Sequence, residues 1–177
     1  IGMVWATRLL GLGRMSRVPG ADLMPKICER AAQAGFGVFL YGASPQVNAA
    51  AASELCRRYP NLRIDGTSHG FSKDDEMPAL IDEINNSGAE ILFIALGSPR
   101  QELWMAEHLP KTSIRVCQGV GGTLDVLAGA VRRAPRAWRA LHLEWAYRLL
   151  SQPSRLLRQT ALPRFASRVL TQRLRGA

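Results

Sequence analysis

The sequence predicts an α/β protein: a Rossmann-like parallel sheet flanked by helices, with a basic C-terminal helical appendage. Through residues 1–130, short apolar segments alternate with stretches of helical periodicity, and several of the apolar segments end at a glycine. This alternation is typical of βαβ units, in which helices cover both faces of a parallel sheet. Beyond that point, arginine and leucine dominate the sequence. We therefore expect a Rossmann-like domain over residues 1–130 and an Arg-rich amphipathic appendage over residues 131–177.

Four short apolar segments are the candidate strands. Residues 38–41 lie between two glycines, and residues 91–96 form the strongest candidate, which ends at Gly97. Residues 62–64 are a weaker candidate, and residues 114–117 precede Gly119. Apolar segments of this length, bounded by glycine, indicate buried strands.

Helices are predicted after Asp22 and over residues 45–58, 74–86 and 99–108. Asp22 is the expected cap of the first helix, and Ser72 with Asp75 resembles a capping box for the third. Ser98 is the expected cap of the fourth, with a proline in its first turn. Ligands of parallel α/β sheets bind beyond the carboxyl ends of the strands. One crevice is therefore expected among the loops at Gly42 and at residues 69–71, 97–101 and 119–125.

Charge is distributed unevenly along the chain, whose net charge is +9. Residues 1–129 hold 12 Lys/Arg and 13 Asp/Glu, whereas residues 130–177 hold 11 Arg and one acid. Such polarity indicates an anionic partner: a phosphate, a nucleic acid or an acidic membrane surface.

The C-terminal segment has the pattern of basic amphipathic helices. One helical stretch is expected over residues 137–150 and a second from Pro153, with a break or kink at Pro163. An apolar stripe is formed by Leu156, Leu157, Ala161, Leu162, Phe165, Val169, Leu170 and Leu174, and arginines fill much of the remainder. This pattern suits a membrane interface. The alternative is an appendage that packs on its own body or on a sister subunit.

Several functional classes are disfavoured. The three cysteines form no CxxC pair, so we expect three half-buried thiols rather than a disulfide framework or a zinc site. The acidic cluster at residues 74–76 is better explained by a first helical turn than by a metal site. No uncharged apolar segment is long enough to span a bilayer.

Two polar or glycine-rich motifs lie at the expected crevice. Gly119, Gly121 and Gly122 follow a strand and open a short helix, where backbone N–H groups can approach a phosphate or nucleoside; a tight structural turn is the alternative. Asp125 either accepts from a uracil N–H or complements the helix terminus. Gln101 and Glu102 either bind sugar hydroxyls or form a solvated helix start.

Taken in order, several segments resemble the WecG/TagA/CpsF family, glycosyltransferase family 26. They are IGMVW at residues 1–5, RVPGADL at 17–23, VFLYG at 38–42, ALGSPRQE at 95–102, GVGGTLDVLAG at 119–129, and RAP at 133–135 leading to LEWAYRLL at 143–150. The resemblance covers nearly the whole chain.

The resemblance implies an inverting, metal-independent hexosyltransferase without a cofactor. It implies a UDP-sugar donor and an undecaprenyl-diphosphate-linked glycan acceptor, in the synthesis of polymers such as teichoic acid or exopolysaccharide. The donated sugar would be N-acetylmannosamine, its uronic acid, or glucose or a similar hexose. The protein would lie in the cytoplasm, associated peripherally with the inner face of the membrane, and a homo-oligomer is compatible with it.

Residue by residue, the resemblance places Asp125 at the uracil and Phe71 where an aromatic ring, often Tyr, stacks on the base. Gln101 matches a glutamine near the transferred sugar. Three arginines match C-terminal residues that reach the diphosphate: Arg148, Arg155 and Arg158.

One departure concerns the catalytic base, which in the family is an Asp in a segment resembling Asp-Gly-Ile-Gly. Ile1 and Gly2 resemble its second half. The resemblance thus implies that this chain is a fragment of the enzyme and lacks its general base. Two alternatives are a noncatalytic nucleotide-sugar-binding fragment and an Arg-rich nucleic-acid-binding protein. The apolar stripe counts against nucleic acid, because an Arg-rich arm needs none.

Overall fold

The computed structural model describes residues 2–13, 15, 18–135, 138, 146–147 and 161–174. The chain forms two compact units. The first, called here the α/β unit, is Val18–Arg132. The second, the helical unit, combines Ile1–Arg17 with Arg133–Ala177.

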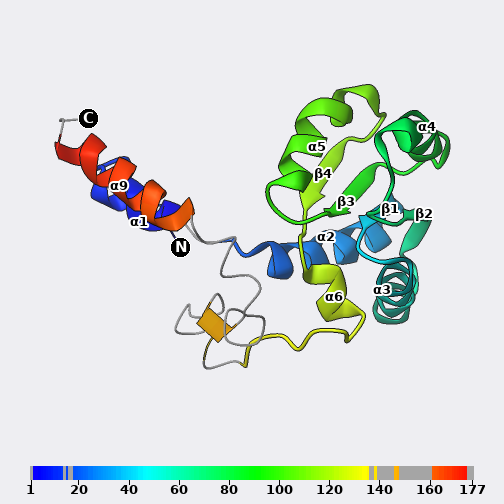
Figure 1. Ribbon diagram of the computed structural model, residues 1–177. Helices are drawn as coiled ribbons and strands as arrows, with labels where there is room; N and C mark the ends of the chain where they lie inside the picture. The colour runs from blue at the N-terminus through cyan, green and yellow to red at the C-terminus, as the bar shows by residue number, and fades with distance from the viewer. Residues whose placement is uncertain are drawn as a thin grey trace. The chain divides into compact units, whose positions relative to one another are not determined.

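The α/β unit is built on a four-stranded parallel sheet (Figure 1). Its strands are β1 (Gly37–Gly42), β2 (Arg63–Ser68), β3 (Ile91–Ala95) and β4 (Val116–Gly119). Their order across the sheet is β2-β1-β3-β4. The chain therefore moves from β1 to one edge and then returns to the other side of β1. This reversal makes the carboxyl ends of β1 and β3 the switch point at which such sheets bind ligands.

Helices cover both faces of the sheet, which confirms the predicted Rossmann-like architecture. One face carries α2 (Gly20–Ala34), α3 (Pro45–Arg58) and α6 (Thr123–Leu127). The other carries α4 (Met77–Asn86) and α5 (Arg100–His108).

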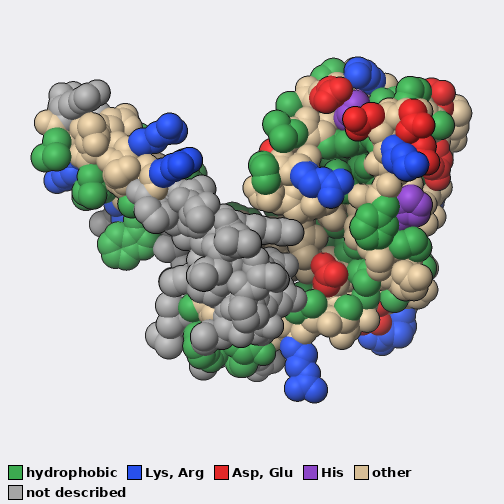
Figure 2. All heavy atoms as spheres, viewed as in Figure 1, with side chains coloured by type: hydrophobic (Ala, Val, Ile, Leu, Met, Phe, Trp, Pro, Cys, Tyr) green, Lys and Arg blue, Asp and Glu red, His purple; other side chains and the backbone are tan. Residues whose placement is uncertain are grey.

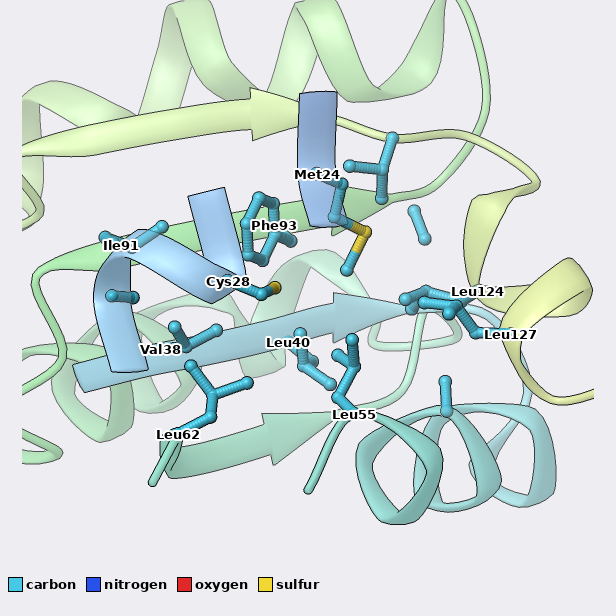
Figure 3. Packing of buried hydrophobic residues seen from close by; sticks show 14 residues of the cluster. Met24, Cys28, Val38, Leu40, Leu55, Leu62, Ile91, Phe93, Leu124 and Leu127 are labelled. Atoms are coloured by element: carbon cyan, nitrogen blue, oxygen red, sulfur yellow. The ribbon is translucent and has the colours of Figure 1, made fainter. Parts of the chain in front are cut away.

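The core lies on both sides of the two central strands. Val38 and Leu40 of β1 pack toward α2 and α3, whereas Phe39 and Tyr41 pack toward α4 and α5. Figure 3 shows the first of these clusters, with Met24 over the sheet. Because both faces are covered, the central strands are apolar throughout rather than alternating, and this made them recognisable in the sequence.

Two strand boundaries differ from the sequence-based expectation. β2 continues to Ser68, beyond the predicted residues 62–64, because polar residues keep pairing with β1. Gly66 lies under the Phe39 ring, where a Cβ would stand 2.3 Å from a ring carbon. At the other edge, β4 begins at Val116, two residues later than predicted.

The predicted helix caps are wrong at three places. Pro19 occupies the cap position of α2, and Asp22 lies in its first turn. Pro99, rather than Ser98, occupies the cap position of α5. In each case the proline already holds the extended or turn backbone that precedes a helix, so no side-chain cap is needed.

The third error is at α4, which is preceded by a 3₁₀ turn, η1 (Asp74–Glu76). Here Glu76 accepts a hydrogen bond from the backbone N–H of Lys73 at 2.8 Å. Ser72 instead hydrogen-bonds the Tyr41 side chain. The predicted capping box of Ser72 with Asp75 is thus replaced by one that begins a residue later.

The cysteines are free, but they are not all half-buried. Cys28 is fully buried, Cys56 is exposed, and only Cys117 is intermediate. Burial raises the pKa of the Cys28 thiol to about 12 and that of Cys117 to about 11. Cys28 therefore behaves as a small apolar side chain of the core.

In the helical unit, α1 (Gly2–Leu9) and α9 (Ala161–Leu174) lie side by side (Figure 1). Phe165 packs against Gly2, where a Cβ would lie 3.4 Å from its ring. The Arg173 guanidinium donates to the Leu9 carbonyl. Part of the predicted apolar stripe therefore packs against α1.

Pro163 stands at the third position of α9, in the first turn, where proline is tolerated. α9 continues past it to Leu174, and the residues immediately before α9, which a break or kink at Pro163 would separate from it, lie outside the described residues. Residues 153–160, where the second stretch was predicted to begin, lie outside the described residues, as does most of 137–150. Among the described helices, none is both long and apolar enough to cross a bilayer.

The two units differ strongly in charge. The α/β unit holds 10 Lys/Arg and 13 Asp/Glu, whereas the helical unit holds 13 Arg and one Glu. In Figure 2, many of the charged side chains on the α/β unit are acidic, whereas the charged side chains on α1 and α9 are basic. The charge polarity seen in the sequence thus includes the N-terminal helix.

One buried amide fastens the first two strands where they end. Asn48 of α3 is only 3% exposed. Its Nδ2 donates to the carbonyls of Leu40, Gly42 and Ser68 at 3.2, 2.9 and 3.0 Å. These carbonyls lie at or near the carboxyl ends of β1 and β2, so Asn48 joins the two strand ends to α3.

We predict that Asn48→Asp lowers the free energy of unfolding by about 2 kcal/mol or more, because it keeps the shape of the side chain and removes both N–H donors from buried carbonyls. Urea denaturation checks this, with Asn61→Asp in an exposed turn as the matched control. Equal stability of the two variants would show that the three contacts contribute little.

Candidate functional site

The loops at the carboxyl ends of the strands are fastened to one another. The backbone N–H of Ala43 donates to Ala95 at 3.1 Å, and that of Gly70 donates to Ala43 at 2.9 Å. The N–H of Val120 donates to Ile94 at 2.8 Å. The loops after β1, β2 and β4 are therefore joined to one another or to the end of β3 within the α/β unit.

The turn after β1 depends on a close approach of two backbones. Gly42 has φ 123° and Ala43 has φ 58°. A Cβ on Gly42 would lie 2.6 Å from the Ala95 carbonyl oxygen. Only glycine fits there, and Ala43 holds a left-handed conformation that costs an L-residue about 1–2 kcal/mol.

Gln101 joins the polar motif after β3 to the glycine motif after β4. Its side chain is 8% exposed, and its Oε1 accepts from the Gly121 N–H at 3.1 Å. Its Nε2 donates to Glu102 Oε1 at 2.9 Å. A Cβ on Gly119 would stand 2.5 Å from Nε2, so the missing side chain of Gly119 makes room for the glutamine.

The structure thus brings together two motifs that the sequence could only treat separately. It also gives the glycines a structural role, since the Gly121 N–H is already bonded to Gln101. Gly122 occupies the cap position of α6, and Asp125 is the third residue of that helix. Asp125 is partly exposed.

Phe71 is the most exposed apolar side chain of the crevice loops, at 66%. It lies three residues after β2, and its backbone N–H donates to His69 Nδ1 at 3.3 Å. The two rings are tilted, with centroids 6.1 Å apart. An exposed ring on a fastened loop presents a flat surface on which a planar base can stack.

A polar cluster beneath this loop was not predicted. Arg100 Nη2 donates to the Gly70 carbonyl at 3.4 Å. Burial raises the pKa of the Tyr41 hydroxyl, while the Arg100 charge and a hydrogen bond from Ser72 act in the opposite direction. The sequence did signal this cation, because Arg100 begins the Arg-Gln-Glu motif, but only the next two residues were assigned to the site.

The predicted arginines Arg148, Arg155 and Arg158 lie outside the described residues. Within the described part of the chain, no group of three or more His, Cys, Asp or Glu side chains is arranged to hold a metal ion.

An apolar groove of about 380 Å³ lies at the opposite end of the sheet. Phe36, Ile91 and Val116 line it, at or just before the amino ends of three strands. Because ligands of parallel sheets bind at the carboxyl ends, this groove is not the predicted site.

We predict that Gly119→Ala and Gln101→Ala each lower stability by about 1 kcal/mol, since each disrupts the bond between Gln101 and Gly121. The double variant should cost little more than either single one, because both changes remove the same interaction. Urea denaturation of the four proteins measures the coupling. Additive losses would mean that Gly119 does not make room for Gln101.

The amino-acid sequence matches the family described as glycosyl transferase WecG/TagA/CpsF over residues 1–177, the whole chain. The match agrees with the resemblance seen in the sequence motifs and with the parallel α/β sheet. The chain belongs to the WecG/TagA/CpsF family of glycosyltransferases.

Proposed function

We propose that this protein is an inverting glycosyltransferase that moves a hexose-type sugar from a UDP-sugar to an undecaprenyl-diphosphate-linked acceptor. The product would be a precursor of a cell-surface polysaccharide. Membership of a glycosyltransferase family over the whole chain carries this proposal. The fastened loops at the switch point support a nucleotide site in the α/β unit.

In this proposal the uracil stacks on Phe71, and Asp125 accepts a hydrogen bond from its N–H. The exposure of Phe71 and the partial exposure of Asp125 support both roles. The turn formed by Gly119, Gly121 and Gly122 lies beside the nucleotide. Gln101 and Glu102, already bonded to each other, present their remaining polar atoms to the hydroxyls of the transferred sugar.

The leaving UDP gains negative charge as the glycosidic bond breaks. We assign its stabilisation to the C-terminal arginines Arg148, Arg155 and Arg158, because preorganised guanidinium groups bind diphosphate oxygens in pairs. A carboxylate base would take the proton from the attacking acceptor hydroxyl. No described residue is assigned that role.

The helical unit is the proposed contact with the membrane that holds the lipid-linked acceptor. Exposed apolar side chains on α1 and α9 support this proposal: Met3, Trp5, Leu170 and Leu174. The arginines of the same two helices, Arg8, Arg164, Arg168 and Arg173, match the charge of an anionic lipid surface. The protein would then lie peripherally on the cytoplasmic face.

We predict that UDP raises the melting temperature of this protein, that ADP does not, and that EDTA leaves the shift unchanged. Differential scanning fluorimetry checks all three. Phe71→Ala should weaken UDP binding about tenfold or more through the lost stacking, whereas Phe71→Tyr should retain it.

Phe36→Ala is the matched control, because it removes an exposed ring at the opposite end of the sheet. A shift with ADP equal to that with UDP would contradict a uridine site. Retained UDP binding in Phe71→Ala would remove the stacking role.

We also predict that the protein binds anionic vesicles and that Leu174→Ser weakens this binding several-fold, because it removes apolar surface from the proposed interface. Leu103→Ser on α5 is the matched control, since it replaces another exposed leucine, on the α/β unit. Co-sedimentation measures both. Equal binding by the two variants would exclude α9 as the membrane contact.

A further inference from the structure

Arg100 is placed to reach across the switch point. It is the first residue of α5, which follows β3. Its guanidinium donates to the carbonyl of Gly70, in the loop after β2. Because β1 lies between β2 and β3 in the sheet, this side chain crosses over the carboxyl end of β1.

The loop that Arg100 reaches is the one that carries Phe71. Gly70 is packed tightly, since a Cβ there would lie 2.9 Å from Leu96 Cδ2 and 3.1 Å from Gly42 Cα. Gly70 is therefore held in place, and the Arg100 guanidinium contacts it one residue before the exposed ring. A nucleotide whose base stacks on Phe71 would therefore lie beside Arg100.

The charge distribution leaves few other cations in the α/β unit for an anionic ligand. That unit has 13 acids against 10 bases. Across the crevice loops, which are Gly42 and residues 69–71, 97–101 and 119–125, the only Lys or Arg residue is Arg100, and Lys73 lies two residues beyond them. A nucleoside diphosphate placed there would have Arg100 as its cationic neighbour within these loops.

The guanidinium has donors available. A guanidinium carries five N–H groups, and the bond to Gly70 uses one of them at a long 3.4 Å. Arg100 is exposed, so its remaining donors face solvent at the ligand edge. The forked geometry of these donors matches phosphate oxygens.

We propose that Arg100 binds a phosphate of the nucleotide from within the α/β unit, as a contact separate from the C-terminal arginines. This inference rests on the proposed function, because it assumes a nucleotide donor. It assigns to Arg100 a direct contact, and not only the fastening of the Phe71 loop.

Comparing UDP with uridine separates the two roles, because uridine stacks on Phe71 but carries no phosphate. Isothermal titration of Arg100→Gln should show UDP affinity about tenfold or more weaker, the loss expected for one charged hydrogen bond, with uridine affinity unchanged. Arg100→Lys should recover part of the UDP affinity, since it keeps the charge and loses the fork. Lys111→Gln, which removes a charge outside the crevice loops, is the control.

An equal loss of UDP and uridine affinity in Arg100→Gln would show that the residue acts only by holding the loop, and it would overturn the proposal. Unchanged UDP affinity would overturn it as well. If the unsubstituted protein binds uridine and UDP equally, Arg100 contacts no phosphate although the nucleoside site exists. If it binds neither, the proposed function itself fails, and the assignment of Arg100 fails with it.

Discussion

The candidate site depends on the close fastening of the strand ends. Three carbonyls of β1 and β2 share the buried amide of Asn48. The next turn brings Gly42 against Ala95 so tightly that no side chain fits. These close contacts require a strained backbone conformation at Ala43. The burial of β1 on both faces stabilises them. A loose edge would leave Phe71 and the glycine turn without a fixed relation to each other.

Most of the architecture was predictable because it depends mainly on the burial of apolar side chains, and apolar segments can be recognised in the sequence. Continuous apolar segments such as residues 91–96 must be buried on both faces, and a sheet with helices on both faces provides that burial. The features that were missed depend on pairing or on backbone geometry. β2 contains Asp65, Gly66 and Thr67, and it is a strand because it pairs with β1, not because it is apolar. Pro19 and Pro99 precede their helices because the proline ring fixes φ. The sequence pattern had instead indicated the side chains of Asp22 and Ser98 as these caps.

In the candidate site, too, some features were predictable from the sequence and others depended on strand pairing. Its loops followed from the carboxyl ends of the predicted strands, and the motifs drew attention to Gln101 and the glycines. Their mutual contact did not follow, since about twenty residues separate Gln101 from Gly121 and only the pairing of β3 with β4 brings them together. Asn48 gave a weak signal, a single amide in an alanine-rich helix, whose meaning appears only with the carbonyls that surround it. The roles of Arg148, Arg155 and Arg158 still rest on resemblance.

The fit between Gln101 and Gly119 also bears on how this site changes during evolution. Any residue larger than glycine at position 119 would occupy the space that the glutamine amide now fills. A lineage that gains a side chain there must shorten or redirect residue 101 at nearly the same time, and the reverse order would leave the Gly121 N–H without its acceptor. The two positions should therefore vary together among homologues, although neither change alone alters the overall fold. Correlated substitution at this pair would show that the two loops have been remodelled together.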